Sequence, residues 1–223
     1  FYQASSSEMF GKVTENPQSE QTAFHPRSPY AISKCFAHFS VLNYREAYNI
    51  HASSGMLFNH ESPLRGLEFV TRKITSTLAH IANGKKIILE LGNLDSKRDW
   101  GFAGDYIKAM WLMLQQDKAD DYVIATEESH TIREFLEKSA GYLGLKLTSE
   151  GEGVDEKIYD QNGHLIAKIN PIHFRPTEVD LLLGDASKEK TILKWKPEHS
   201  FDKLVKVMME ADFDKVNKGI SLQ

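Results

Sequence analysis

The sequence predicts an α/β fold in which a mainly parallel sheet is followed by a smaller mixed α/β lobe. Up to about residue 145, short apolar segments alternate with segments whose apolar residues recur at helical spacing, a pattern typical of strand–helix–strand units. Beyond that point, residues 149–154 are rich in glycine and glutamate, and Asn162-Gly163 is a strong hairpin signal. We therefore expect one domain over residues 1–145 and a mostly C-terminal lobe over residues 146–223.

Strands are expected where short apolar runs are bounded by polar segments. The first run opens the chain and ends at Ser5, and a proline-containing polar loop over residues 11–29 follows it. Further strands are expected at residues 52–58, 86–91 and 122–125, with a hairpin over residues 159–165.

Helices are expected where capping residues precede periodic apolar positions. Ser28-Pro29 predicts the start of a helix that runs to about Asn49, because proline fits the first helical turn. A second helix begins near residue 67 and is closed by Gly84. Further helices are predicted over residues 105–115, after Ser129 as an N-cap, and from residue 201 onward.

The composition indicates an ordinary globular protein. Of the 223 residues, 41% are hydrophobic and 26% charged, and the net charge of -4 gives no basic excess for nucleic acid or an anionic membrane. No apolar run approaches the ~20 residues that span a bilayer. The single cysteine, Cys35, cannot form an internal disulfide, and no Cys/His cluster has zinc spacing. These features predict a cytoplasmic protein without a metal site.

The chain opens on Phe1, within what reads as a strand already under way. No Gly-x-x-Gly-x-x-Gly or Gly-x-Gly-x-x-Gly occurs after a strand, although a dinucleotide site needs such a turn. We therefore expect upstream sequence that carries the dinucleotide-binding half, and we expect residues 1–223 alone neither to hold a dinucleotide tightly nor to catalyse.

Tyr30 and Lys34 are the first candidates for chemistry. Their i,i+4 spacing puts both on one helical face, and a lysine ammonium beside a phenol stabilises the phenolate, so that the tyrosine can act as a base. Ser6 and Glu8 follow the first strand, where ligand sites of doubly wound sheets lie. The alternative for each is structural: a solvated helical face for the pair, and a loop with local hydrogen bonds for residues 5–8.

Several blocks in order resemble the extended short-chain dehydrogenase/reductases that act on nucleotide sugars, and most closely the GDP-mannose 4,6-dehydratase family. The matching blocks are residues 5–8, 26–34, 57–63, 65–66, 69–74, 91–95, 97–101, 175–180 and 195–197. The resemblance covers nearly the whole chain. It implies that residues 1–145 form the C-terminal part of a doubly wound, Rossmann-like parallel sheet with interleaved substrate-binding segments. Residues 146–223 would then form a smaller, mostly C-terminal substrate-binding lobe.

The resemblance also implies roles for individual residues. Tyr30 matches the family's base, Lys34 the lysine that also bonds the nicotinamide ribose, and Glu8 the catalytic glutamate. Ser6 stands where the family has a catalytic threonine, so the hydroxyl is retained and a methyl group is lost. Ser7 lies where related glucose-nucleotide dehydratases carry an aspartate, and a serine there favours the mannose substrate.

For the ligands, the resemblance implies NADP as cofactor and GDP-mannose as substrate. The cofactor contacts it implies are Tyr30, Lys34, His60 and Arg65. The nucleotide-sugar contacts are Asn59, Lys73, Arg98, Arg175 and Glu178. Arginines suit a diphosphate, because their forked donors match phosphate oxygens. A homodimer or homotetramer is the expected assembly.

The implied reaction oxidises C4 of the sugar, eliminates water across C5 and C6, and returns the hydride to C6. Rival interpretations are another nucleotide-sugar dehydratase, epimerase or reductase, and an inactive nucleotide-sugar-binding fragment. An epimerase has no need of Glu8 beside the hydroxyl.

Other conspicuous residues are expected to be structural. Arg27 and Arg45 are expected in surface or structural ion pairs, and Cys35 is expected to pack in its helix. The tryptophans are predicted to pack rather than to form stacking platforms: Trp100, Trp111 and Trp195.

Overall fold

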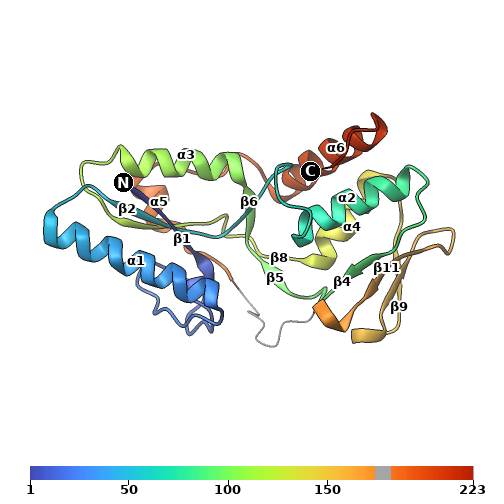
Figure 1. Ribbon diagram of the computed structural model, residues 1–223, viewed down its shortest axis with the longest axis horizontal. Coiled ribbons are helices and arrows are strands. Elements are labelled where there is room, and N and C mark those ends of the chain that lie inside the picture. The colour runs from blue at the N-terminus through green and yellow to red at the C-terminus, as the bar shows by residue number, and fades with distance from the viewer. Residues whose placement is uncertain (174–181, 223) are drawn as a thin grey trace. The chain divides into compact units, whose positions relative to one another are not determined.

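The computed structural model describes residues 1–173 and 182–222 and contains two compact units that interleave along the chain (Figure 1). Unit 1 comprises Phe1–His60, Lys97–Ser129 and Val179–Ser200. Unit 2 comprises Glu61–Ser96, His130–Glu178 and Phe201–Gln223. The predicted assignment of substrate-binding segments to either side of residue 145 stays a prediction.

Unit 1 is built on a parallel sheet whose strand order is β1-β2-β7. The strands are β1 (Tyr2–Ser6), β2 (Ser53–Leu57) and β7 (Asp121–Ile124). The last residues of the three strands are in register, because Ser6 pairs with Leu57 and Leu57 pairs with Ile124. The predicted α/β fold with a parallel sheet is confirmed, and the carboxyl ends of all three strands meet at one edge.

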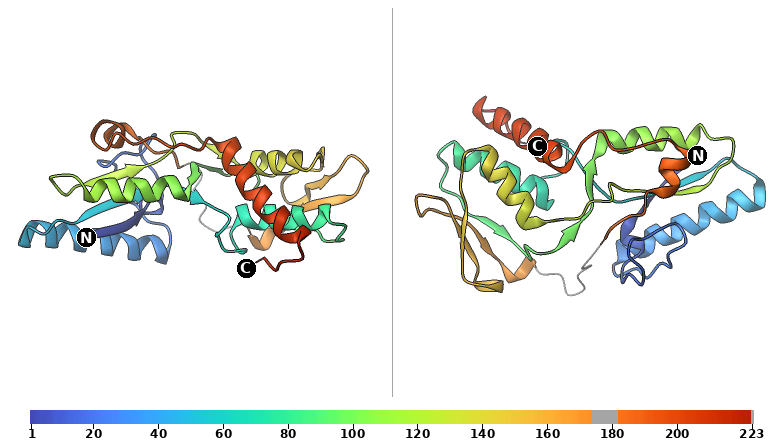
Figure 2. Two further views of the ribbon diagram at one scale, coloured as in Figure 1. Left: turned by 90° about the horizontal axis from the view of Figure 1, so that it is seen from above. Right: turned by 180° about the vertical axis from the view of Figure 1, so that it is seen from behind.

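Helices cover both faces of this sheet. The helix α1 (Pro29–Tyr48) lies on one face and α3 (Ala103–Leu114) on the other, as the views in Figures 1 and 2 show. Successive residues of a strand point to opposite faces. Met56 and Val123 therefore enter one apolar cluster, whereas Leu57 and Ile124 enter another.

The predicted ends of α1 are confirmed. The Ser28 hydroxyl accepts a hydrogen bond from the Ala31 amide at 3.1 Å, and Pro29 occupies the first turn. At the other end Asn49 adopts a left-handed conformation with φ 51°, which asparagine tolerates better than most residues. The position of Tyr30 in the first turn of α1 is thus determined by local sequence.

Unit 2 contains a mixed sheet with the order β4-β11-β10-β9. Its strands are β4 (Leu89–Leu91), β9 (Thr148–Glu150), β10 (Lys157–Tyr159) and β11 (Leu165–Ile169). The pairs β9–β10 and β10–β11 are antiparallel, and β11–β4 is parallel. The predicted hairpin is confirmed, because β10 and β11 flank the Asn162-Gly163 turn, in which Gly163 has a φ of 78°.

Three helices of unit 2 pack pairwise: α2 (Val70–Ala82), α4 (Ile132–Tyr142) and α6 (Phe201–Asn217). Ser129 is not the N-cap of α4, and that prediction is wrong. Thr131 caps the helix instead, because its hydroxyl accepts from the Glu134 amide while the Glu134 carboxylate accepts from the Thr131 amide. This reciprocal capping box satisfies two helix-terminal donors at once, which a lone serine cannot do.

Short elements that were not expected from the sequence complete the described part of the chain. The strands are β3 (Asn59–Glu61), β5 (Lys97–Arg98), β6 (Trp100–Phe102) and β8 (His130–Thr131). The short helices are η1 (Ser7–Met9), η2 (Gly153–Asp155), η3 (Pro171–His173) and α5 (Ser187–Ile192).

A buried ion pair joins two of the unit 2 helices. The Arg72 side chain of α2 is fully buried and donates through Nε to Asp212 Oδ2 of α6 at 3.0 Å. Its Nη2 lies 3.0 Å from Asp212 Oδ1, and Nη1 donates to the carbonyls of Pro63 and Arg65. Thr75 donates to the same carboxylate at 2.6 Å. One guanidinium therefore holds α6 and the loop before α2.

Replacing Asp212 with asparagine should lower the free energy of unfolding by about 3–5 kcal/mol, because the buried Arg72 charge loses its counter-ion. Chemical denaturation measures this loss. The control is Asp202→Asn, which removes an exposed partner of Lys138 and should cost at most about 1 kcal/mol. Equal effects of the two variants would contradict the structural role assigned to Arg72.

Candidate active site

The carboxyl end of β1 leads directly into η1, which carries Glu8. The Ser6 hydroxyl accepts a hydrogen bond from the Glu8 amide at 3.2 Å and so caps this short helix. Met9 and Phe10 follow and are completely buried, which anchors the far end of η1 in the core. Ser6 and Glu8 are thereby held at the sheet edge where the ligand sites of parallel α/β folds lie.

The first turns of α1 lie against this segment, because α1 packs on both β1 and η1. Lys34 Nζ donates to the Ala4 carbonyl of β1 at 2.8 Å and lies 5.5 Å from the centroid of the Tyr30 ring. The Tyr30 side chain is 53% exposed, so its hydroxyl is accessible to a ligand. The fold thus gathers the four candidate catalytic residues onto touching elements.

Two more candidates follow the end of β2 at the same edge. Asn59 Oδ1 is buried and has no hydrogen-bond partner within the described residues, which is an unusual and costly state for an amide oxygen. His60 Nδ1 donates to the Phe58 carbonyl at 2.9 Å, and the His60 ring stacks on Tyr106 with centroids 4.9 Å apart. These contacts fix the orientation of the imidazole.

A buried acid, Asp99, organises the loops beyond β7 and was missed by sequence reasoning. One of its oxygens accepts from the Thr126 amide and hydroxyl at 2.9 and 2.7 Å, and the other from the amides of Glu127 and Gly184 at 3.1 and 3.4 Å. Burial outweighs these hydrogen bonds and raises the pKa of Asp99 to about 6. A Cβ on Gly184 would lie 2.3 Å from the Ala125 Cβ, so glycine is required for this approach.

A second buried acid, Glu189 of α5, was also missed. Burial raises its pKa to about 10, with further contributions from the negative charges of Asp99, Glu127 and Glu20. The side chain is therefore protonated at neutral pH.

Beside Asp99, Arg98 donates through Nη1 to the Lys97 carbonyl at 2.7 Å. Arg98 is a predicted substrate contact, and its neighbour Asp99 is the residue that fixes the local backbone.

Two cofactor and substrate candidates belong to unit 2. The Arg65 guanidinium lies 3.5 Å from the Phe69 ring centroid, and its Nε is 3.3 Å from Glu61 Oε2. Lys73 Nζ lies 3.2 Å from His173 Nε2, and burial lowers the pKa of Lys73. Two further candidates, Arg175 and Glu178, lie outside the described residues.

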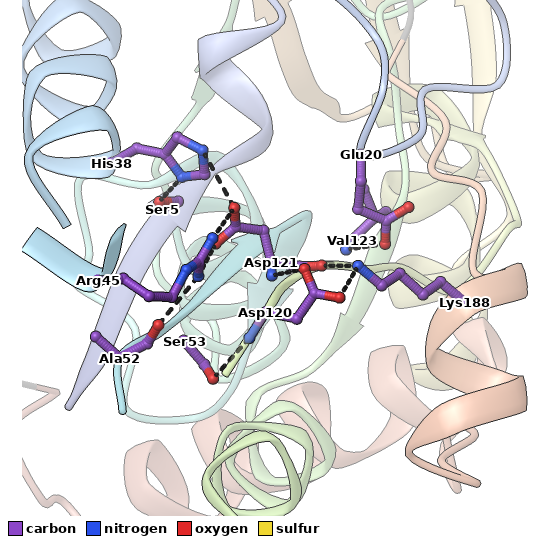
Figure 3. Close-up of polar contacts among 10 residues, drawn as sticks. All are labelled: Ser5, Glu20, His38, Arg45, Ala52, Ser53, Asp120, Asp121, Val123 and Lys188. Carbon is purple, nitrogen blue, oxygen red and sulfur yellow. Dashed lines mark hydrogen bonds and ion pairs between the residues drawn. The ribbon is translucent and has the colours of Figure 1, made fainter. Parts of the chain in front are cut away.

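Some residues that were expected to be structural are confirmed as such. Arg45 forms a two-pronged ion pair with Asp121, both N–O distances being 2.9 Å (Figure 3). Cys35 packs on the apolar cluster that contains Phe10 and Phe58, and burial raises the pKa of its thiol.

The tryptophan prediction is correct only in part. Trp100 and Trp195 are buried, and Trp195 Nε1 donates to the Asp105 carbonyl at 2.9 Å. Trp111 is 62% exposed, so the expectation that it packs is wrong for this chain. The helical periodicity of α3 could not show whether Trp111 is buried or exposed. Trp111 lies on the face of α3 turned away from the sheet, beside the exposed Ile107.

The described part of the chain contains neither a membrane-spanning helix nor a metal-binding cluster. Across residues 1–173 and 182–222, no helix is long and apolar enough to cross a membrane. Within the same ranges, no three His, Cys, Asp or Glu side chains are grouped closely enough to hold a metal ion.

Comparisons with known proteins agree on one family. A family model described as GDP-mannose 4,6 dehydratase matches residues 1–208. The GDP-mannose 4,6 dehydratase of Drosophila melanogaster is 55% identical over 220 residues, which are 98% of this chain and 56% of that protein. The GDP-mannose 4,6 dehydratase 1 of Arabidopsis thaliana is 58% identical over 214 residues, 96% of this chain and 55% of the relative. The chain therefore spans about half the length of these curated relatives.

Solved structures agree on the fold. RMD from Pseudomonas aeruginosa, complexed with NADPH, superposes with a TM-score of 0.79 at 22% identity, over 96% of this chain and 66% of that one. The dTDP-glucose 4,6-dehydratase of Bacillus anthracis, in complex with NAD, superposes with a TM-score of 0.78 at 21% identity, over 98% of this chain and 63% of that one. At these identities the likeness supports the fold alone.

The raised pKa of Asp99 makes stability depend on pH. Because the folded state binds the Asp99 proton more tightly than the unfolded state, stability should fall as pH rises from about 4 through about 6. Relative to Asp99→Asn, which does not titrate, the wild type should lose about 2–3 kcal/mol of unfolding free energy across this window. Chemical denaturation at several pH values checks this. A constant difference between the two proteins would contradict it.

Proposed function

The chain belongs to the GDP-mannose 4,6-dehydratase family, and from this membership we propose that the complete protein converts GDP-mannose to GDP-4-keto-6-deoxy-mannose with loss of water. The structural observation that carries the proposal is the meeting of two segments at the carboxyl end of β1. One is η1 with Glu8, and the other is the first turns of α1 with Tyr30 and Lys34. Together with Ser6 they offer a carboxylate, a phenol, an ammonium and a hydroxyl.

Removal of the proton from the sugar's 4-hydroxyl is assigned to Tyr30. Its oxygen is the base that accepts this proton, and the Lys34 ammonium lies 5.5 Å from the centroid of its ring. The ammonium has three N–H donors, and the Ala4 carbonyl takes one of them. The hydroxyl of Ser6 accepts from the Glu8 amide through a lone pair, so its own O–H can donate to the same substrate oxygen.

Elimination is assigned to Glu8. A ketone at C4 acidifies the C5 proton, and a carboxylate can then accept it. The C6 hydroxyl leaves with a proton from Glu8, so that a proton from C5 and a hydroxyl from C6 depart together as water. Glu8 begins and ends this step as a carboxylate. Its partly buried position in η1 favours direct transfer over exchange with bulk water.

NADP is the proposed cofactor, and the donor set of the chain fits a nicotinamide dinucleotide. Lys34 and Tyr30 can hold ribose hydroxyls, and His60 follows β2 at the same sheet edge. Arg65 supplies a guanidinium suited to phosphate. When bound, NADP would supply a hydride acceptor for C4 and a hydride donor for C6, which would make the overall reaction redox-neutral.

The proposed nucleotide-sugar contacts supply charge and hydrogen bonds. The unpartnered Asn59 Oδ1 is an acceptor suited to a ligand hydroxyl. Lys73, Arg98 and Arg175 supply positive charge for the diphosphate, and Glu178 supplies an acceptor. A cytoplasmic location and a homodimeric or homotetrameric assembly complete the proposal.

Product analysis tests the proposal against its rivals. The complete protein should convert GDP-mannose with NADP to a 4-keto-6-deoxy product, detected by mass spectrometry and NMR. Turnover of dTDP-glucose in preference to GDP-mannose would identify another nucleotide-sugar dehydratase, and a C4-inverted sugar would identify an epimerase. Binding of GDP-mannose without any product would indicate an inactive module.

Tyr30→Phe should lower kcat by about 10²–10⁴-fold, because the general base is removed while the ring and its packing remain. The affinity for GDP-mannose, measured by calorimetry, should stay within about twofold of the wild type. Wild-type turnover by this variant would remove Tyr30 from the mechanism.

Glu8→Gln should block elimination more than oxidation, because an amide cannot accept the C5 proton. In D₂O the variant should show cofactor reduction on a single turnover but no deuterium at C5. The control is Glu15→Gln, a carboxylate that accepts from Thr22 in the loop after η1 and should turn over normally. Full dehydration by Glu8→Gln would place the base elsewhere.

A further inference from the structure

Three side chains on one face of α1 make polar contacts with the sheet. Lys34 donates to the Ala4 carbonyl. The His38 ring meets the Ser5 hydroxyl, and Arg45 pairs with Asp121 (Figure 3). The spacings of four and seven residues bring all three onto one helical stripe. Two of these contacts fall on consecutive residues of β1, immediately before Ser6.

The middle contact is buried. His38 Nδ1 lies 3.0 Å from Ser5 Oγ, and the two residues are only 4% and 3% exposed. Water cannot replace either partner at such a depth, so losing one side leaves the other unsatisfied. The Phe24 ring meets the imidazole edge-on with centroids 5.3 Å apart, and Phe39 does so at 5.6 Å. The ring therefore has little room to turn.

The charged groups around His38 determine which nitrogen carries the proton. His38 Nε2 lies 4.0 Å from Asp121 Oδ2, and Arg45 binds the same carboxylate. An N–H facing the carboxylate is favoured over a lone pair, so Nε2 is the protonated nitrogen. Nδ1 then accepts, and the Ser5 hydroxyl donates to it. Burial lowers the pKa of His38, as does Arg45, while Asp121 acts in the opposite direction, so the ring is neutral at pH 7.

We propose that His38 is a positioning residue for the Tyr30–Lys34 pair, and that its hydrogen bond with Ser5 fixes the register of α1 along β1. The Lys34 contact alone cannot do this, because a four-carbon stem adapts to a shifted helix. An imidazole has two rotatable bonds and is held between aromatic rings, so its contact fixes both the translation and the rotation of the helix. Lys34 lies one turn before His38, and Ser6 directly follows Ser5.

The expected effect on turnover rests on the proposed function, whereas the His38–Ser5 hydrogen bond does not. His38 is only 4% exposed, too buried for a ligand to reach, so its effect on turnover passes through the placement of Tyr30 relative to Ser6 and Glu8. Misplacing a reacting group by about 1 Å can cost about 10²-fold in rate. Substrate affinity, which depends on other residues, should change little.

The test uses the complete protein with His38→Leu, Ser5→Ala, their double variant and His38→Asn. His38→Leu and Ser5→Ala should each lower kcat about 10–100-fold with KM for GDP-mannose within about twofold. The double variant should be no worse than the weaker single variant, because both remove one interaction. His38→Asn should stay within about threefold of the wild type, since its Oδ1 can occupy the acceptor position of Nδ1.

The matched control is Ser53→Ala, which removes an equally buried serine hydroxyl from β2, where it meets the Asp120 amide (Figure 3). It should lower the melting temperature as much as Ser5→Ala does but leave kcat unchanged. An equal loss of kcat in Ser53→Ala, or wild-type kcat in folded Ser5→Ala, would overturn the proposal.

A second readout does not depend on turnover. Hydrogen–deuterium exchange over residues 30–38 should accelerate at least tenfold in Ser5→Ala, while exchange in α3 stays unchanged. Unchanged exchange in α1 would overturn the positioning role. A wild-type protein that does not convert GDP-mannose would contradict the proposed function alone. The exchange result would still show whether the His38–Ser5 hydrogen bond positions α1.

Discussion

The parallel register of β1, β2 and β7 is the constraint on which the candidate site depends. Because Ser6, Leu57 and Ile124 end their strands side by side, whatever follows each strand is delivered to the same edge. Glu8 follows the first, Asn59 and His60 the second, and the loops held by Asp99 the third. A one-residue slip of a strand would turn its buried side chains to the opposite face and disrupt both apolar clusters.

Buried polar groups supply the precision that apolar packing lacks. Apolar clusters tolerate small shifts, whereas a carboxylate that accepts several hydrogen bonds does not. Asp121 binds α1 to the sheet through Arg45, and Asp99 joins three loop segments through backbone amides. In unit 2, Asp212 and Arg72 do the same for α6 and α2. Each group is costly to bury, and each is satisfied by partners far away in the sequence.

The sequence predicted what local chemistry determines. Ser28-Pro29 and Asn49 bounded α1 correctly, and Asn162-Gly163 marked the hairpin, because both signals act over a few residues. Helical spacing only made Tyr30 and Lys34 candidates for chemistry, and their catalytic roles came from the family resemblance. The sequence did not identify Thr131 as the cap of α4. Its reciprocal contact with Glu134 depends on where the helix begins, which the sequence does not show.

Long-range partners could not be predicted in the same way. Asp99 and Asp121 look like ordinary loop and strand carboxylates in the sequence, and only the fold reveals their burial and partners. The exposure of Trp111 likewise depends on which face of α3 meets the sheet. The roles of the ligand-contact residues remain predictions, since they depend on a bound cofactor and substrate.

The most direct test of the central claim follows a deuterium label through the sugar. The complete protein with NADP would be given GDP-mannose deuterated at C4, and the product would be examined by NMR. A redox-neutral dehydration at the Tyr30–Glu8 edge predicts that the C4 deuterium reappears at C6 of a 4-keto-6-deoxy sugar. Loss of the label to solvent, or its retention at C4, would contradict that chemistry.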